Sequence, residues 1–251
     1  MNTCVVNRKK GEFDMKIEVI RPGCQKKILC MPGLFMSGDC FERLVDYLQE
    51  YSLVMVTYNA HDEGTRFSSF DNEVEEIASR LSQMDLRCFD IVLGTSIGAI
   101  LSIKLLTEKG IQTKKLVLDG LKSYRVGRKE VAGLHIQFVL FKLISACHID
   151  FLRCIYSADW AKKMGACARN MSWESLKHFV NDFASLELTE PLPKHSTVLY
   201  GEKEQHNEEN RKRLAAVSPN TKIVVKKKHD HLTFLDQYPE TYAKMLQDIF
   251  A

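Results

Sequence analysis

The chain has 251 residues, and 45% of them are hydrophobic, which is enough apolar material for one sizeable core in one domain with an insertion. Its formal net charge is only +3, so the composition excludes a strongly basic protein and makes nucleic acid a poor candidate partner. The longest run of lysines is at 226–228.

The cysteines and the N-terminal segment bear on the compartment. Eight cysteines are spread along the chain without a Cys-x-x-Cys pair or the spacing of metal ligands. The segment MNTCVVNRKKGEFD lacks the apolar core of a secretory signal. We therefore expect a cytoplasmic protein whose cysteines are reduced thiols, several of them buried, with a disulfide framework as the alternative.

Strands and helices alternate along the first half of the chain. The apolar runs Met15–Ile20 and Lys27–Met31, each followed by a Pro-Gly turn, predict strands. Apolar residues at helical spacing predict a helix over Ser37–Glu50. The elements expected next are a strand at Ser52–Tyr58, a polar loop at 59–69, a helix at 70–84, a strand at Phe89–Leu93, a helix at 97–109 and a strand at Leu116–Leu118.

The second half contains a long segment without strands. Residues 121–190 hold about three helical patterns, among them Val131–Ile149 and Ser172–Phe183. Val131–Ile149 is the most apolar stretch of the chain, but two histidines, a glutamine and a lysine interrupt it. We therefore expect a soluble helix and no membrane span, with a role at a membrane surface left open. Strands at Thr197–Tyr200 and Lys222–Val225 and a closing helix at 239–250 follow.

Strands separated by helices pair in parallel through right-handed crossovers. The sequence therefore predicts an α/β fold with a mostly parallel central sheet flanked by helices. Residues 1–120 and 191–251 are expected to form its core, and residues 121–190 a helical cap over the carboxyl ends of the strands.

A Gly-x-Ser-x-Gly pentapeptide, Gly94-Thr95-Ser96-Ile97-Gly98, lies between the strand FDIVL and the helix AILSIKLL. A sharp turn from a strand into a helix forces the corner residue to a positive φ and holds its side chain above the sheet, at the positive end of the helix. Gly94 and Gly98 allow the backbone to pass closely. The motif indicates Ser96 as a nucleophile, and a glycine-rich turn with an incidental serine is the alternative.

On this motif and its flanking elements the chain resembles the α/β-hydrolase superfamily. The resemblance covers residues 15–120 and 195–250, with the segment between them in the place of the family's variable cap. It implies a catalytic triad in the order serine, acid, histidine, with each residue on a loop at the carboxyl end of a strand.

The acid is expected in the turn GEKE, residues 201–204, which resembles the Gly-x-x-Asp turn of the family and places Glu204 in the acid position. A carboxylate is needed there because it fixes the tautomer of the histidine that activates the serine. Asp119, directly after the strand Leu116–Leu118, is the alternative acid.

The base is expected near the last strand. His231 is followed by Leu232 and precedes Pro239, which matches the family's pattern of a histidine shortly before a Pro-initiated final helix. Asp230 stands where the family usually has glycine. His229 is the alternative base.

The oxyanion of an acyl-transfer reaction needs two preorganised N–H donors. The N–H of Ile97, directly after the nucleophile, is one candidate, and the N–H of Leu34 is the other. Gly33 keeps the backbone open beside Leu34. Pro32 occupies the position of the family's usual histidine, so a hydrogen bond that often steadies this loop is absent.

The sequence predicts no cofactor and no metal. It contains no phosphate loop, dinucleotide fingerprint or His-Glu-x-x-His motif. His229, Asp230 and His231 lie close together but have no Cys or Glu partner at ligand spacing. His61, in the loop after the strand Ser52–Tyr58, is expected to be structural or solvent-facing rather than catalytic.

The predicted cap is rich in leucine, phenylalanine and tryptophan, so we expect part of it to pack internally and the rest to line an apolar pocket. The lysines at 226–228 are expected to be solvated, with attraction of an anionic substrate as the alternative. The sequence thus predicts a monomeric or weakly dimeric carboxylesterase that cleaves a small-molecule ester or thioester with a small to medium apolar acyl group, through an acyl-enzyme.

Two alternatives stay open. The same triad performs amide, lactone or carbon–carbon bond hydrolysis, or acyl transfer, on this fold. A non-catalytic small-ligand-binding protein on the same fold is the alternative from another class, although it does not require a complete triad.

Overall fold

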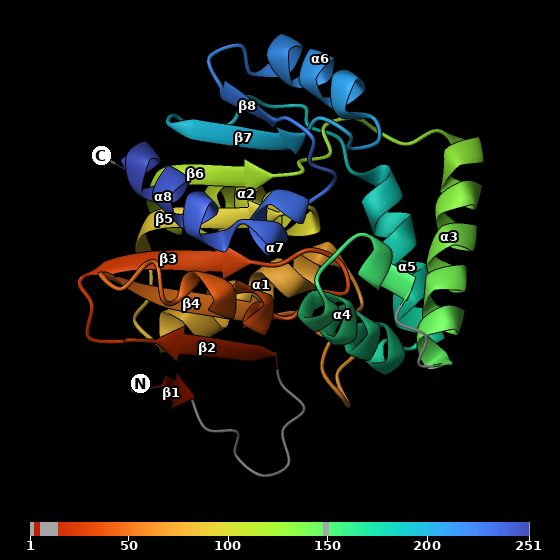
Figure 1. Ribbon diagram of the computed structural model, residues 1–251, viewed down its shortest axis with the longest axis horizontal. Helices are drawn as coiled ribbons and strands as arrows, with labels where there is room; N and C mark the ends of the chain where they lie inside the picture. Colours follow the sequence, from red (N-terminus) through yellow and green to blue (C-terminus); the bar gives the residue numbers. More distant parts are fainter. Residues whose placement is uncertain (1–2, 6–14, 148–150, 251) are drawn as a thin grey trace.

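A computed structural model describes residues 3–5, 15–147 and 151–250. Its centre is an eight-stranded sheet in the order β1-β2-β4-β3-β5-β6-β7-β8 (Figure 1). The strands are β1 Thr3–Val5, β2 Lys16–Ile20, β3 Lys26–Met31, β4 Tyr51–Thr57, β5 Cys88–Thr95, β6 Gln112–Asp119, β7 Ser196–Gly201 and β8 Lys222–Lys226.

Six strands, β3 to β8, pair in parallel, whereas β1 and β2 are antiparallel at one edge. The predicted α/β class with a mostly parallel sheet is therefore confirmed. The expectation of parallel pairing is wrong for β2, which runs antiparallel to β4. Residues 21–25 between β2 and β3 are too few for a parallel crossover, so β2 must run opposite to β3.

Helices cover both faces of this sheet. They are the 3-10 helices η1 Gly38–Leu44 and η2 Phe151–Cys154 and the α-helices α1 Phe70–Gln83, α2 Ile97–Glu108, α3 Arg128–Ala146, α4 Ala158–Asn170, α5 Trp173–Ser185, α6 Asn207–Val217, α7 Thr233–Gln237 and α8 Pro239–Phe250. α1 packs on α2 behind the sheet of Figure 1, and α8 packs on η1 at the opposite face.

The helix predicted over Ser37–Glu50 is wrong in type and length, because the structure has the 3-10 helix η1 there. Gly38, Phe41 and Leu44, every third residue, are buried in it. A 3-10 helix repeats every three residues and therefore aligns these residues along one face more closely than an α-helix with 3.6 residues per turn does.

α1 illustrates why the better-predicted helices form where they do. Ser69 caps it by accepting a hydrogen bond from the Asn72 N–H at 3.2 Å. Its buried residues recur at helical spacing and face the sheet; they are Phe70, Glu73, Val74, Ile77 and Leu81. The helix predicted over 70–84 is confirmed as Phe70–Gln83.

Between β6 and β7 the described chain is helical, with α3 packed on α4 and α5 beyond the arrowheads of β3, β6 and β7 (Figure 1). The helix expected over Val131–Ile149 is α3, and residues 148–149 of that prediction lie outside the described residues. Among the residues described, no helix is both long and apolar enough to cross a bilayer.

Candidate active site

Ser96 forms the corner between β5 and α2. Its φ is 54° and its ψ is −115°, which is a strained backbone for a residue with a Cβ. A Cβ on Gly98 would lie 2.1 Å from the Met31 carbonyl oxygen, and one on Gly94 would lie 2.5 Å from the Gly98 carbonyl oxygen. The Ser96 N–H donates to the Asp119 carbonyl at 2.7 Å. Two glycines and one long-range hydrogen bond therefore hold the serine at this sharp corner.

Glu204 and His231 meet at the carboxyl ends of β7 and β8. His231 Nδ1 lies 2.7 Å from Glu204 Oε1, and the second carboxylate oxygen accepts the Gly201 N–H at 3.2 Å. The Glu204 side chain is 8% exposed and that of His231 is 34% exposed. The carboxylate is thus fixed by its own turn, and the imidazole it binds keeps its other nitrogen available.

The electrostatics favour a basic imidazole. Burial by itself lowers the pKa of His231, but attraction to the Glu204 carboxylate and the hydrogen bond between them outweigh it, so its pKa is raised above the usual value. A proton on Nδ1 that points at the carboxylate leaves Nε2 as the proton acceptor. The Tyr156 hydroxyl donates to the His231 carbonyl at 3.0 Å and steadies the backbone of this loop.

Ser96 and the His231 loop come together around Gly33. A Cβ on Gly33 would lie 3.2 Å from Ser96 Cβ and 3.5 Å from Leu232 Cδ1, so the serine and the residue after the histidine both border this glycine. No hydrogen bond joins Ser96 Oγ to His231 within the described part of the chain. Such bonds are often long before substrate binds and tighten in the complex.

Asp119, the alternative acid, lies near the pair without joining it. Its side chain is buried, and Oδ2 accepts a hydrogen bond from the Tyr242 hydroxyl at 3.0 Å. Burial, and then repulsion from Glu204, raise the pKa of Asp119 to about 7. Glu204 rather than Asp119 is hydrogen-bonded to His231.

His229, the alternative base, has different neighbours. Its Nδ1 lies 3.4 Å from Thr233 Oγ1, and its ring packs against Phe234 and Tyr238 at centroid distances of 5.2 and 5.1 Å. Burial and the nearby Lys226 lower its pKa. The described contacts of His229 include no carboxylate that could orient it as a base.

The two candidate oxyanion donors lie beside Ser96. Ile97 begins α2, so its N–H has no acceptor within the helix. Leu34 follows Gly33, whose missing Cβ leaves Ser96 within contact distance. The sequence predicts that His61 is structural or solvent-facing. The residue is buried, and its Nε2 accepts the Phe35 N–H at 2.9 Å.

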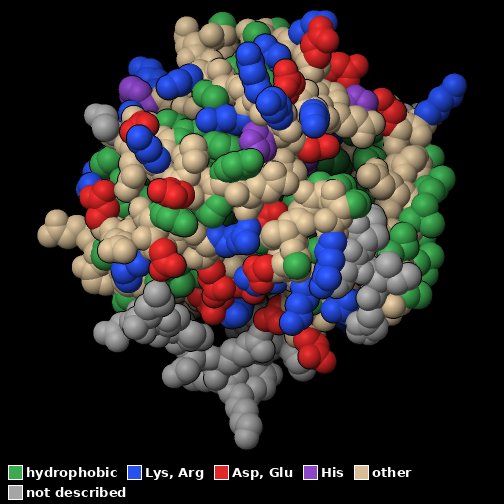
Figure 2. Space-filling view, in the orientation of Figure 1, with side chains coloured by type: hydrophobic (Ala, Val, Ile, Leu, Met, Phe, Trp, Pro, Cys, Tyr) green, Lys and Arg blue, Asp and Glu red, His purple; other side chains and the backbone are tan. Residues whose placement is uncertain are grey.

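The aromatic residues between β6 and β7 divide between the interior and the surface. Phe141 and Phe138 of α3 pack on Phe35 at ring-centroid distances of 4.5 and 6.0 Å. Trp160 is fully buried. Leu140 and Leu143 of the predicted apolar set face outward, because α3 lies at the edge of the molecule where Figure 2 shows apolar side chains, and Trp173 at the start of α5 is exposed as well. Ile136 and Val139 of α3, which lie outside that set, are also exposed.

Sequence analysis missed several residues that support this site. Gly120, Tyr156 and Asp236 all contact the His231 loop or hold it in place. Only Gly120 carries a local signal, because it directly follows a candidate acid at the end of a strand. The other two act through contacts between distant segments, which leave no local pattern.

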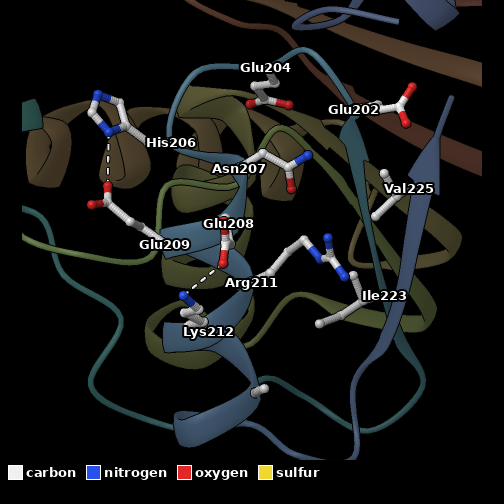
Figure 3. A pocket seen from close by; sticks show the side chains of 11 residues that line it. Glu202, Glu204, His206, Asn207, Glu208, Glu209, Arg211, Lys212, Ile223 and Val225 are labelled. Carbon is white, nitrogen blue, oxygen red and sulfur yellow. Dashed lines mark hydrogen bonds and ion pairs between the residues drawn. The ribbon is translucent and has the colours of Figure 1, made fainter. Parts of the chain in front are cut away.

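Two further surface features lie near the site, the lysine run and an open groove. Lys227 and Lys228 are exposed, and Lys226 Nζ lies 4.3 Å from the centre of the Phe234 ring. An open groove of about 880 Å³ runs between α6 and β8 (Figure 3), with Glu204 at one end and mostly charged side chains along it; neither Ser96 nor His231 lines it. The described residues hold no cluster of three or more metal-ligating side chains.

Comparisons with known proteins rest on structure alone. No family model and no curated protein matches the sequence. An α/β hydrolase family protein from Desulfitobacterium hafniense is 18% identical with a TM-score of 0.75, and 94% of this chain covers 100% of it. An esterase from Exiguobacterium antarcticum is also 18% identical, with a TM-score of 0.76 and coverage of 94% of this chain and 96% of its own.

A thermophilic esterase from Thermogutta terrifontis is 11% identical with a TM-score of 0.74, and the match covers 100% of both chains. The TM-scores of these three structures lie between 0.74 and 0.76, and the matches cover 94–100% of this chain. At 18% identity or less, these structural likenesses establish the fold alone. This protein has the α/β-hydrolase fold.

Proposed function

We propose that this protein is a serine hydrolase that cleaves a carboxylic ester or thioester through an acyl-enzyme. The observation that carries the proposal is the 2.7 Å contact between Glu204 and His231 Nδ1, beside a serine held at positive φ on a strand-to-helix corner. An incidental serine requires neither the strained corner nor the oriented imidazole. The esterases among the structural neighbours support the same reaction class.

The reaction follows from these groups. Ser96 Oγ attacks the carbonyl carbon while His231 Nε2 accepts its proton, and the Leu34 and Ile97 N–H groups bind the developing oxyanion. Collapse of the tetrahedral intermediate breaks the bond to the leaving group, which takes the proton from His231. Water then attacks the acyl-enzyme with His231 as base, which releases the acid and restores Ser96.

The acyl group is proposed to be apolar and of small to medium size. The supporting observation is that Phe35, next to the candidate donor Leu34, packs on Phe138 and Phe141. Aromatic side chains beside the reacting carbonyl favour an apolar acyl chain and offer no partner to a charged one.

A fluorophosphonate probe tests the proposal, because it labels an activated serine covalently. We expect the wild type to be labelled, Ser96→Ala to be unlabelled, and His231→Ala to be labelled at least about a hundred times more slowly. Ser68→Ala, which changes an exposed serine before α1, serves as the control and should label like the wild type. An unlabelled wild type, or equal labelling of Ser96→Ala, contradicts the proposal.

The acid is tested by a matched pair of substitutions. Glu204→Gln should lower kcat/KM about a thousandfold, since the amide cannot hold the required tautomer and charge. Asp119→Asn should stay within about tenfold of the wild type, because Asp119 bonds to Tyr242 rather than to His231. The reverse order would make Asp119 the acid. A panel of esters, thioesters and amides with acyl chains of graded length then identifies the bond.

A further inference from the structure

The candidate oxyanion donor Leu34 lies between two peptide planes that are each held by a hydrogen bond. The Gly33–Leu34 peptide carries the Leu34 N–H, and its carbonyl accepts the Met36 N–H at 3.2 Å. The next peptide carries the Phe35 N–H, which donates to His61 Nε2 at 2.9 Å. The first bond is internal to the loop, whereas the second comes from a residue 26 positions away.

This contact fixes the state of the His61 ring. A backbone N–H can only donate, so Nε2 must be the acceptor and the proton must lie on Nδ1. Nδ1 accordingly has an acceptor, the Asn59 carbonyl, at 3.2 Å. Burial lowers the pKa of His61 to about 4, so the ring is neutral wherever an imidazole base with a raised pKa can work.

The loop needs an outside partner because it is strained. Phe35 has a φ of +59°, which costs a residue with a Cβ about 1 kcal/mol or more. Pro32 has no N–H and no polar side chain with which to steady the loop. The buried Phe35 N–H would lose its acceptor without His61, and an unpaired buried donor costs a further 1–3 kcal/mol or so.

His61 is itself held on both sides. The Asn59 N–H donates to Glu73 Oε2 of α1 at 3.2 Å, which anchors the start of the loop. The Asn170 side chain at the end of α4 donates to the His61 carbonyl at 3.1 Å. The ring of Tyr58 packs edge-on against the imidazole at 5.7 Å. The imidazole therefore has one available position.

We propose that His61 is a positioning residue for the oxyanion hole: by accepting the Phe35 N–H it sets the peptide plane after Leu34 and so aims the Leu34 N–H at the oxyanion. The inference rests on the proposed function. It assigns to the loop after β4 a role in transition-state stabilisation, in a chain whose Pro32 cannot steady the loop.

Three variants test this role. His61→Leu removes the acceptor, His61→Gln keeps an acceptor at similar reach, and Tyr58→Phe alters the same buried cluster without touching the hydrogen bond. We expect His61→Leu to lower kcat/KM for an ester by about 10- to 100-fold, with KM within about threefold, because the lost interaction is made in the transition state. His61→Gln and Tyr58→Phe should stay within about threefold of the wild type.

Affinity for a trifluoromethyl ketone, whose carbonyl carbon is attacked by Ser96 Oγ to form a hemiketal with its oxyanion in the hole, should fall in His61→Leu by the same factor as kcat/KM. Near-ultraviolet circular dichroism checks that each variant is folded. Folded His61→Leu with wild-type kcat/KM and inhibitor affinity overturns the inference, as does folded His61→Gln that has lost as much as tenfold. If His61→Leu does not fold, the glutamine variant decides alone.

The failure of this inference is distinct from failure of the proposed function. If the fluorophosphonate does not label the wild type, the proposed function is wrong. If the wild type is labelled at Ser96 and folded His61→Leu is labelled at the same rate, only the proposed role of His61 is wrong.

Discussion

Gly120 shows how closely the site is built around single atoms. Its φ is +70°, and a Cβ on it would lie 2.4 Å from His231 Cε1 and 3.3 Å from Glu204 Oε1. A side chain there would push the imidazole away from its carboxylate. Gly110 has nearly the same backbone, with a φ of +68°, but a Cβ on it would meet nothing within 4 Å. Substituting each glycine therefore distinguishes the effect of backbone strain, which applies at both positions, from crowding of the site, which applies only at Gly120.

We expect Gly120→Ala to lower kcat/KM at least about a hundredfold, because a misplaced base costs this much even when the fold survives. Gly110→Ala should cost about 1–2 kcal/mol of stability through its left-handed backbone and leave kcat/KM unchanged. Steady-state kinetics and urea unfolding of both variants provide the measurement. Wild-type activity in Gly120→Ala would contradict the geometry around His231.

At the scale of elements, α7 connects the histidine loop to two other segments. Asp236 in α7 is fully buried; its Oδ1 accepts from Arg43 Nη1 at 2.6 Å and from Ser157 Oγ at 2.5 Å, and its Oδ2 accepts the Ser157 N–H at 2.6 Å. Arg43 belongs to η1, and Ser157 caps α4. One carboxylate thus holds three elements together five residues after His231.

Asp236→Ala should lower the free energy of unfolding by about 3 kcal/mol, since it removes the buried carboxylate that the half-buried Arg43 guanidinium and the α4 cap residue Ser157 both bind. It should also lower kcat/KM, because α7 fixes the end of the His231 loop. Asp248→Ala, at an exposed acid of α8, should change stability by less than about 0.5 kcal/mol. Urea unfolding tests both variants, and equal free energies of unfolding for the two would show that the Asp236 carboxylate does not stabilise the fold.

At the scale of the whole molecule, buried titratable groups act in opposite directions on stability. Burial raises the pKa of Glu73 from 4.5 to about 8 and lowers that of His61 from 6.5 to about 4. Above pH 4.5 the unfolded chain ionises Glu73 while the folded chain keeps it protonated, so stability falls as the pH rises towards 8. Below pH 6.5 the unfolded chain protonates His61 while the folded chain does not, so stability falls as the pH drops towards 4.

We therefore expect the free energy of unfolding to fall by about 2 kcal/mol or more between pH 5.5 and pH 8, because Glu73 and Asp119, whose pKa is raised to about 7, both ionise in the unfolded chain before they ionise in the folded one. Glu73→Gln should reduce the loss of stability between pH 5.5 and pH 8, because glutamine does not ionise in the unfolded chain. Activity should rise as the pH increases, since the proposed base His231, whose pKa is raised, must be neutral to accept a proton. Urea unfolding and kcat/KM as functions of pH check this, and an unchanged alkaline slope in Glu73→Gln would contradict it.

Much of the architecture could be predicted because its signals are local. Apolar runs between turns marked β3 to β8, helical spacing marked α1, and the glycines around Ser96 marked the corner. Each signal lies within a dozen residues, where backbone sterics and periodicity are written directly in the sequence. The antiparallel β2, the 3-10 form of η1 and the helices α6 and α7 were missed, because neighbouring elements decide them.

The sequence by itself determined the class of the fold, the position of Ser96 at a strand-to-helix corner, and the order in which Glu204 and His231 follow. Only the tertiary structure decided that Glu204 rather than Asp119 binds His231, that His61 holds the Phe35 N–H, and that part of α3 faces outward. The physical reason is that the two hydrogen bonds join residues 27 and 26 positions apart, and that Asp119 is held instead by Tyr242, 123 positions away. Which segments meet depends on the packing of the whole chain, and no local spacing records it.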